Sequence, residues 1–259
     1  MAFVLYRNER IGILSITEVI MELTNRLRTL TEYVDKGMRV ADVGCDHGYV
    51  PIYLIQENIA SYALAMDINK DPLTKASNNA RAHKVNDKFE TRLSNGLVEL
   101  KSGEVDCVII AGMGGKLIES ILQRDAKKLQ SYKRLILSPH KDIQAVREKL
   151  SELNIPIVNE SMLYEDGHFY NFIIAEPEAE ISNESLKFNE EKELLQFISN
   201  KYGKILIISK NQVLKQQITE LLPKQEALCD QLKAKNVIDR VAELEKEIEI
   251  GKKVLKWLT

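Results

Sequence analysis

Up to about residue 176, short apolar runs alternate with segments of helical periodicity. The apolar runs predict five strands, at Met38–Val43, Tyr62–Met66, Phe89–Leu93, Cys107–Ala111 and Arg134–Leu137. Several are continuously apolar, which is typical of strands buried on both faces of a parallel sheet. The intervening periodicity predicts helices at Tyr49–Asn58, Asp71–His83, Lys116–Leu129 and Asp142–Asn154. This alternation predicts a doubly wound, Rossmann-like α/β sheet.

The alternation ends in two further strand-like runs, Pro156–Tyr164 and Phe169–Ala175. Only Glu165-Asp166-Gly167-His168 separates them, which leaves no room for a helix. Because parallel strands need a longer crossover, we expect an antiparallel hairpin at the sheet edge, which completes a seven-stranded sheet.

After Pro177 the pattern becomes helical. The sequence predicts a polar linker at Glu178–Ser185 and a helix at Glu190–Ser199. The next segment, Lys201–Ser209, could be either a strand or a buried helix. Beyond these, apolar residues recur with heptad spacing at Leu214, Ile218, Leu221, Gln225, Leu228 and Leu232, then at Val237, Val241, Leu244, Ile248, Gly251, Leu255 and Leu258. The spacing predicts a small α-helical, coiled-coil domain built on an antiparallel helical hairpin. These rows of apolar residues could form the core of the domain, a surface that binds a macromolecule, or both.

Three residues mark expected details of this hairpin. Asn236 is expected to cap the second helix. Pro223 is expected to kink the first helix or mark its start, and Gly251 to permit close approach of the partner helix. The chain is thus divided into an N-terminal extension at residues 1–20, an α/β domain at 21–177 and the helical domain at 178–259.

Composition narrows the class of protein. The chain has 259 residues, 44% hydrophobic and 29% charged, as expected of a soluble globular protein. No apolar run approaches the roughly 18 residues of a membrane span. Arg7 and the polar residues after it interrupt the N-terminal apolar run, which makes a poor secretory signal. Three scattered cysteines favour a reducing cytoplasm over a disulfide framework or zinc cluster. The net charge of −2 excludes a polycation but not a nucleic-acid enzyme.

The first predicted strand ends in a glycine-containing turn, Asp42-Val43-Gly44-Cys45-Asp46-His47-Gly48-Tyr49. Such a turn brings the backbone close to a ligand and directs a helix N-terminus toward it. Dinucleotide-binding turns have the pattern G-x-G-x-x-G, but Asp46 stands at the second glycine position and Tyr49 at the third. Because an anionic Asp46 would repel a pyrophosphate, NAD is disfavoured.

S-adenosylmethionine fits this turn better, because it carries a sulfonium and an ammonium and no phosphate. The carboxylates of Asp42 and Asp46 then favour binding, and Asp67, which ends the second strand, is placed to accept the ribose hydroxyls. Asn95-Gly96 ends the third strand and is placed to meet the adenine edge. Ala111-Gly112-Met113-Gly114-Gly115 ends the fourth strand, where the methyl group and its acceptor would meet. Each of these four segments alone is also typical of an ordinary helix cap or turn. All four in this order are a more specific indication of a nucleoside-binding site.

These motifs together resemble a known family. DVGCDHGYVPIYL, MDIN, NGL and IAGMGG are similar to the class I methyltransferases of the bacterial TrmK type, which make 1-methyladenosine at position 22 of tRNA. The resemblance covers about residues 21–177. Cys45, Gly48 and Asn95 depart from the residues more usual in the family, and Ser138-Pro139-His140 replaces an expected Gln-Pro-Asn.

The resemblance implies a cytoplasmic tRNA methyltransferase that uses S-adenosyl-L-methionine. We expect tRNA as partner, no metal, no membrane association and a monomeric chain. The cofactor site is expected to comprise Arg26, Asp42, Gly44, Cys45, Asp46, Gly48, Asp67, Ile68, Asn95, Gly96, Ala111, Gly112, Met113 and Gly114. The catalytic candidates are Asp46, His47, Tyr49 and Met113. His140 and His168 are expected to be loop residues.

Two other functions remain open at this stage. The same cofactor motifs serve methyltransferases for proteins or small molecules. A non-catalytic adaptor could instead use the coiled coil while keeping a relic nucleotide-binding fold. For RNA contact, the sequence offers two basic clusters, Arg124, Lys127, Lys128, Lys133 and Arg134 in the first domain, and Lys201, Lys204, Lys210 and Lys215 in the second.

Overall fold

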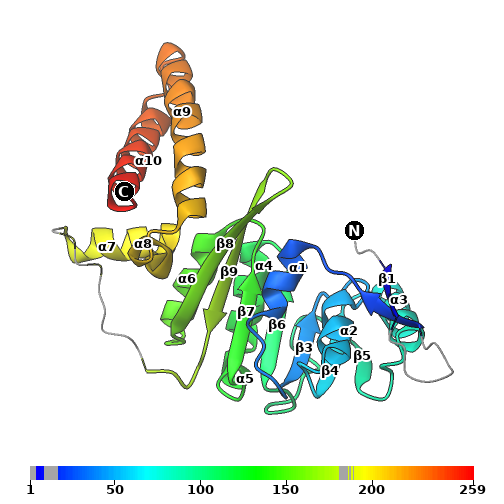
Figure 1. Cartoon of the computed structure of the whole chain (residues 1–259). Helices are drawn as coiled ribbons and strands as arrows, with labels where there is room; N and C mark the ends of the chain where they lie inside the picture. The colour runs from blue at the N-terminus through cyan, green and yellow to red at the C-terminus, as the bar shows by residue number, and fades with distance from the viewer. Residues whose placement is uncertain (1–3, 9–16, 181–185, 187, 189) are drawn as a thin grey trace. The chain divides into compact units, whose positions relative to one another are not determined.

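The computed structural model describes residues 4–8, 17–180, 186, 188 and 190–259 (Figure 1). The chain divides into two compact units. Unit 1 comprises Met1–Asn159 and Phe172–Ser182, and unit 2 comprises Glu160–Asn171 and Asn183–Thr259. The tip of the terminal strand hairpin is therefore part of unit 2, a feature that the sequence pattern does not reveal.

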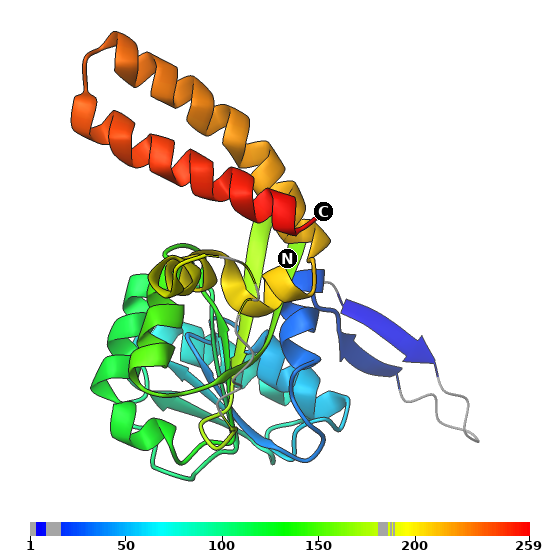
Figure 2. The ribbon, with the colours of Figure 1, turned by 90° about the vertical axis from the view of Figure 1, so that its left-hand side faces the viewer.

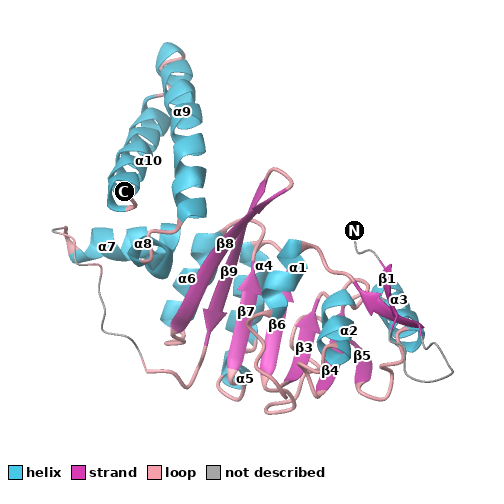
Figure 3. Cartoon of the chain, in the orientation of Figure 1, coloured by secondary structure: helices cyan, strands magenta, loops and turns pink. Residues whose placement is uncertain are grey.

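The main sheet has seven strands in the order β5-β4-β3-β6-β7-β9-β8 (Figure 3). Neighbouring strands from β5 to β7 are parallel, whereas β9 is antiparallel to β7. The bounds are β3 Arg39–Val43, β4 Tyr62–Asp67, β5 Phe89–Leu93, β6 Cys107–Ala111, β7 Arg134–Ser138, β8 Ile157–Glu165 and β9 His168–Ala175. The predicted sheet is confirmed, and every predicted strand lies within two residues of its observed bounds.

Helices cover both faces of this sheet. They are α1 Asn25–Thr31, α2 Tyr49–Gln56, α3 Lys70–Ala82, α4 Gly115–Arg124, α5 Ala126–Leu129 and α6 Ile143–Glu152. Strand β4 is buried on both faces. On one face Leu64 and Met66 pack in the core with α4 and α6, and on the other Ala63 and Ala65 pack against α2 and α3. Alternate residues of a strand point to opposite faces, so a strand buried on both sides is apolar throughout.

The terminal hairpin is confirmed. Only Asp166 and Gly167 separate β8 from β9, and their φ angles are 50° and 79°. Positive φ at both turn residues is the conformation that tight two-residue hairpins require, and Asp-Gly is a preferred pair for it.

The single helix expected at Lys116–Leu129 is wrong. It is two helices, α4 and α5, that meet at Asp125, whose side chain is only 6% exposed. The N-terminal extension contains an unpredicted antiparallel pair, β1 Val4–Asn8 with β2 Thr17–Met21.

Unit 2 is mainly helical, with α7 Lys192–Ile198, the π-helical turn η1 Ser199–Gly203, α8 Lys204–Ile208, α9 Gln212–Ala234 and α10 Ile238–Trp257. The ambiguous Lys201–Ser209 segment is therefore helical. Helices α9 and α10 lie side by side and antiparallel, joined by a short turn (Figure 2). Their buried side chains share one core with residues of η1 and α8.

The heptad seam predicted for α9 is partly wrong. Leu221 and Leu228 are 41% and 44% exposed, while Leu222 and Cys229 are buried in their place. The seam therefore moves by one residue next to Pro223, which lies inside α9 and does not begin it. In α10 the expected close approach is confirmed, because a Cβ built on Gly251 would lie 3.0 Å from Leu222 Cδ2.

Asn236 does not cap α10 with its side chain. It has a φ of 56° and lies in the turn after α9, and α10 begins at Ile238 after Val237. Asparagine tolerates this left-handed conformation better than most residues, so a turn position suits it.

Candidate functional site

Every loop of the predicted cofactor site lies at one edge of the sheet. Strands β3, β4, β5 and β6 are mutually parallel, so their carboxyl ends meet at that edge. Ligands of open α/β sheets bind beyond the carboxyl ends of the strands. The fold therefore brings together the four segments that the sequence singled out.

The first and fourth loops touch through a glycine and a methionine. Gly44 has a φ of 79°, and its amide donates to the Met66 carbonyl at 2.8 Å. A Cβ built on Gly44 would overlap the terminal methyl group of Met113. The positive φ favours glycine here, and any larger residue would also have to displace the flexible Met113 side chain.

Asp42 is a buried carboxyl group at the base of the site. Burial, with a smaller contribution from Asp67, raises the pKa of Asp42 to about 7, and the positive charge of Arg26 opposes the shift. Two carboxylates and a guanidinium thus lie close enough to influence one another. A bound cation would favour the ionised form of Asp42.

Arg26 faces the site and is not an exposed helix residue. Its Nη1 atom is buried, 4.0 Å from a Cβ built on Gly112. Thr24 caps α1, since its hydroxyl oxygen accepts from the Leu27 amide at 3.4 Å. The cap begins α1 beside Arg26 and directs the guanidinium toward the fourth loop. A guanidinium in this position suits a ligand carboxylate.

The catalytic candidates of the first loop form one group at the surface. The Asp46 side chain is 74% exposed, and its Oδ1 lies 3.5 Å from His47 Nε2. The His47 and Tyr49 rings stack, with centroids 5.1 Å apart and an interplanar angle of 10°. Asn79 holds this loop by donating to the His47 carbonyl at 3.0 Å. The two rings offer a flat surface beside a carboxylate.

Gly48 and Cys45 have packing roles. A Cβ built on Gly48 would lie 2.9 Å from Ala76 Cβ and 3.2 Å from the Phe89 ring, so this glycine lets α2 approach α3 and β5. Cys45 is buried, and burial together with nearby carboxylates raises the pKa of its thiol. A thiol held protonated is a poor nucleophile.

The second loop begins at Asp67. Its Oδ1 accepts the amide of Asn69 at 2.8 Å, which fixes the carboxylate and leaves Oδ2 for a ligand. Ile68, the next residue, is 60% exposed. A large apolar side chain exposed beside a fixed carboxylate suits a nucleoside, which has hydroxyls on one part and a flat ring on the other.

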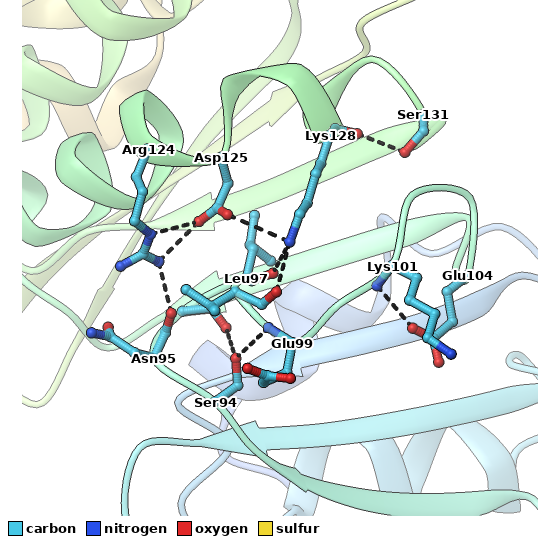
Figure 4. Close-up of polar contacts among 12 residues, drawn as sticks. Ser94, Asn95, Leu97, Glu99, Lys101, Glu104, Arg124, Asp125, Lys128 and Ser131 are labelled. Atoms are coloured by element: carbon cyan, nitrogen blue, oxygen red, sulfur yellow. Dashed lines mark hydrogen bonds and ion pairs between the residues drawn. The ribbon is translucent and has the colours of Figure 1, made fainter.

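The third loop, Asn95-Gly96, lies against α4. The exposed Asn95 presents its side chain outward, while its carbonyl accepts from Arg124 Nη2 at 2.7 Å (Figure 4). Gly96 has a φ of 61°, and a Cβ there would lie 2.6 Å from Arg124 Nη2 and 2.9 Å from Ile121.

The fourth loop, Ala111–Gly115, is anchored to the loop after β7. The amide of Gly112 donates to the Ser138 carbonyl, that of His140 to Met113, and that of Gly115 to Lys141, at 3.1, 2.9 and 2.8 Å. Ala111, the last residue of β6, is half-buried, and Gly114 precedes α4 as its cap residue. Because the fourth loop is bonded to it, the loop after β7, residues 139–142, is a fifth loop at the binding edge.

His140 lies in that fifth loop, as the sequence predicts, but its position beside Gly112 was not anticipated. Its Nε2 lies 3.6 Å from a Cβ built on Gly112, at the same place as Arg26. The signal was available, because β7 is parallel to β6 and also ends at the binding edge. His168 lies instead in the terminal hairpin, where its Nδ1 is 2.8 Å from the Asp166 carbonyl oxygen.

The basic cluster of the first domain is mostly used inside the protein. Lys133 pairs with Asp106 at 3.2 Å, and Arg134 pairs with Asp35 and Glu176 at 2.9 and 2.6 Å. Arg124 and Lys128 bind carbonyls of the third loop. These four side chains therefore have partners within the protein, and their contact with RNA stays a prediction.

Within the described ranges, His, Cys, Asp and Glu side chains do not gather in threes as a metal site would require. No helix among the described residues has the length and apolar content of a membrane span.

Comparisons with known proteins agree with this architecture. Residues 23–173 match the model of a family described as a methyltransferase domain. A curated relative from Bacillus subtilis (strain 168), named tRNA (adenine(22)-N(1))-methyltransferase, is 37% identical over 156 residues, or 60% of this chain. That alignment spans 66% of the relative's length.

Solved structures are similar over nearly the whole chain. The crystal structure of the B. subtilis m1A22 tRNA methyltransferase TrmK has a TM-score of 0.78 and 29% identity, covering 90% of this chain and 99% of that one. The structure of M. capricolum TrmK in complex with S-adenosylhomocysteine has a TM-score of 0.78 and 26% identity, covering 92% and 99%.

Proposed function

This chain belongs to the methyltransferase-domain family, and from that premise we propose that it transfers a methyl group from S-adenosylmethionine to N1 of an adenine in tRNA. The similarity to tRNA (adenine(22)-N1)-methyltransferases supports position 22 as the target. The proposal includes that the enzyme acts in the cytoplasm. The observation that carries the proposal is the group of Asp42, Asp67 and Arg26 at the binding edge, beneath the contact of Gly44 with Met113.

The charges of this group match the polar parts of the cofactor. Asp67 Oδ2 would accept ribose hydroxyls, Asp42 and Asp46 would face the cationic groups, and Arg26 would bind the carboxylate. Gly44 lets the first loop approach closely. When bound, S-adenosylmethionine supplies an electrophilic methyl carbon on its sulfonium.

The acceptor side requires orientation more than proton transfer. Neutral adenine N1 already carries a lone pair, so a strong general base is unnecessary, and the methylated base is cationic. The exposed Asp46 carboxylate would stabilise that charge, while the stacked His47 and Tyr49 rings would hold the base. Because N1 lies on the Watson–Crick edge, the enzyme must unpair the adenine.

The two alternative functions fit less well. A protein or small-molecule methyltransferase would share the cofactor edge, but the relative and structures described above are tRNA enzymes by name. A relic adaptor would have no need to keep Asp42, Asp46, Asp67 and the fourth-loop glycines together.

The test is methyl transfer to unmodified bulk tRNA with labelled S-adenosylmethionine, followed by nucleoside analysis. Labelled 1-methyladenosine is expected, and a transcript with guanine at position 22 should receive no label. Label in protein, in small molecules or in another nucleoside would contradict the assignment. Absence of S-adenosylmethionine binding by calorimetry would overturn it altogether.

A further inference from the structure

The connection between β5 and β6 must fix the third loop without a helix. Residues 94–106 contain no helix in the structure. Leu97, Leu100 and Val105 of this connection are buried in the core shared with α4. A buried backbone without helical hydrogen bonds needs other partners for its carbonyls.

Side chains supply those partners for four successive carbonyls (Figure 4). Arg124 Nη2 donates to Asn95 O at 2.7 Å, and Ser94 Oγ to Gly96 O at 2.8 Å. Lys128 Nζ donates to Leu97 O and Val98 O, at 2.9 and 2.7 Å. The carbonyls of residues 95–98 therefore accept hydrogen bonds from within the protein.

A buried carboxylate orients the two cations. Asp125 Oδ2 accepts from Arg124 Nε at 3.0 Å and Nη2 at 2.9 Å, and Oδ1 lies 3.6 Å from Lys128 Nζ. The Asp125 side chain is only 6% exposed, whereas those of Arg124 and Lys128 are 39% and 28% exposed. The break between α4 and α5 thus occurs at the residue that links both donors.

We propose that Arg124, Asp125 and Lys128 form a carbonyl clamp that positions the third loop for the adenine ring of the cofactor. With the carbonyls of residues 95–98 held by the clamp and Ser94, the loop can offer a ligand the exposed Asn95 side chain and the amide N–H groups of Asn95 and Gly96. The amides of Ser94, Val98 and Glu99 already donate within the protein. Adenine presents ring nitrogens that accept hydrogen bonds and an exocyclic amine that donates them. Amide N–H groups can pair with the ring nitrogens, and the side-chain amide of Asn95, which both donates and accepts, can pair with either. Arg124 and Lys128 are positioning residues, which act through the loop.

This inference rests on the proposed function, and its test begins with the unmodified protein. Binding of S-adenosylmethionine and of 5′-methylthioadenosine is measured by calorimetry for the whole chain, then for Arg124→Ala and Lys128→Met. The second ligand keeps the adenine and ribose but lacks the amino acid. Lys127→Met, which alters an exposed neighbour on α5, is the matched control.

Both clamp variants are expected to bind both ligands about fivefold to twentyfold more weakly, by similar factors, because the loss arises at the adenine. Lys127→Met should stay within about twofold of the unmodified chain. Arg124→Lys keeps a donor and should recover much of the affinity. The KM for tRNA should change less than the affinity for the cofactor.

Several results would contradict the proposed clamp without contradicting the proposed function. These are unchanged affinity in both clamp variants, a loss confined to S-adenosylmethionine, or equal losses in Arg124→Lys and Arg124→Ala. A lower melting temperature without weaker binding would likewise assign the three residues to stability alone. If the unmodified chain binds neither ligand, the proposed function fails first, and the clamp fails with it.

Discussion

Asp42 carries a carboxyl group that burial makes difficult to ionise. Its pKa in the fold is about 7, against 3.8 as its ordinary value. Between those pH values the native state holds a proton that the unfolded chain has lost, so the free energy of unfolding falls as pH rises from about 4 to 7. Asp67 strengthens this effect and Arg26 opposes it.

Replacing Asp42 with Asn should remove this pH dependence. Since Asn cannot ionise, the Asp42→Asn protein without cofactor should gain on the order of 2–4 kcal/mol at pH 8 relative to the unmodified chain. It should differ much less near pH 4. Urea unfolding at both pH values measures this. Parallel stability curves for the two proteins would show that Asp42 is ionised in the fold as readily as in water.

Asp46 differs from Asp42 in exposure, and its substitution should affect turnover. It has a φ of 45°, which Asn tolerates, so Asp46→Asn should keep the loop conformation. Losing a carboxylate beside the developing positive charge should lower kcat by about tenfold or more, while the Kd for S-adenosylmethionine changes by less than about threefold. Equal losses in kcat and Kd would reassign Asp46 to cofactor binding.

At the scale of elements, the start of α4 depends on one glycine. A Cβ built on Gly115 would overlap the Asp142 carbonyl oxygen and lie 2.6 Å from that of Lys141, and both are backbone atoms. Gly115→Ala should therefore destabilise the protein by about 2–3 kcal/mol and weaken cofactor binding through the fourth loop. Gly114→Ala is the matched control, because its Cβ would meet only the flexible Lys141 side chain, at 3.3 Å. Similar urea midpoints for the two variants would contradict this steric argument.

The elements also show what sequence can and cannot predict. Strands β3, β4, β6 and β7 were predictable because burial on both faces leaves a largely apolar run. β5, at the sheet edge, has the mixed sequence FETRL and is only partly buried. The break at Asp125 was not predictable, because helical periodicity continues through it. Arg124 and Lys128, the ion-pair partners of Asp125, bind carbonyls of the third loop, which is distant in sequence. The seam of α9 moves near Pro223 for a similar reason, since spacing alone does not record which of two adjacent apolar residues is buried.

The site divides in the same way. The positions of Asp42, Gly44 and Asp67 at the binding edge were predictable because each lies at or next to the end of a recognisable strand. Arg26 was found by resemblance, and its burial shows that it faces the site. The contacts of Arg124, Asp125 and Lys128 with the third loop were not predictable, because they depend on which strands and helices are neighbours in space.

At the scale of the whole molecule, selection of one adenine needs contacts beyond the cofactor edge. Unit 2 contains a groove of about 700 Å³ whose lining includes Trp257, Ile208, four lysines and two glutamates, at Lys210, Lys252, Lys253, Lys256, Glu190 and Glu249. Lys252 and Lys253 form ion pairs with Glu226 and Glu190, at 2.6 and 2.8 Å. Lys201 is instead held by Glu247 at 3.4 Å and by the faces of Phe197 and Tyr202. Lysines on such a groove can neutralise phosphates, which position a nucleic acid without reading its sequence.

A chain shortened to end at Glu176 tests whether unit 2 supplies these contacts. It keeps all four cofactor loops but loses the partners of Met162, which packs in the core of unit 2. We expect it to fold with a lower melting temperature and to bind S-adenosylmethionine within about threefold of the full chain. Its KM for tRNA should rise by about tenfold or more, and the salt dependence of tRNA binding should flatten, because fewer phosphates are neutralised. Full methylation activity with an unchanged salt slope would show that the helical hairpin serves stability, and that the first unit selects the tRNA by itself.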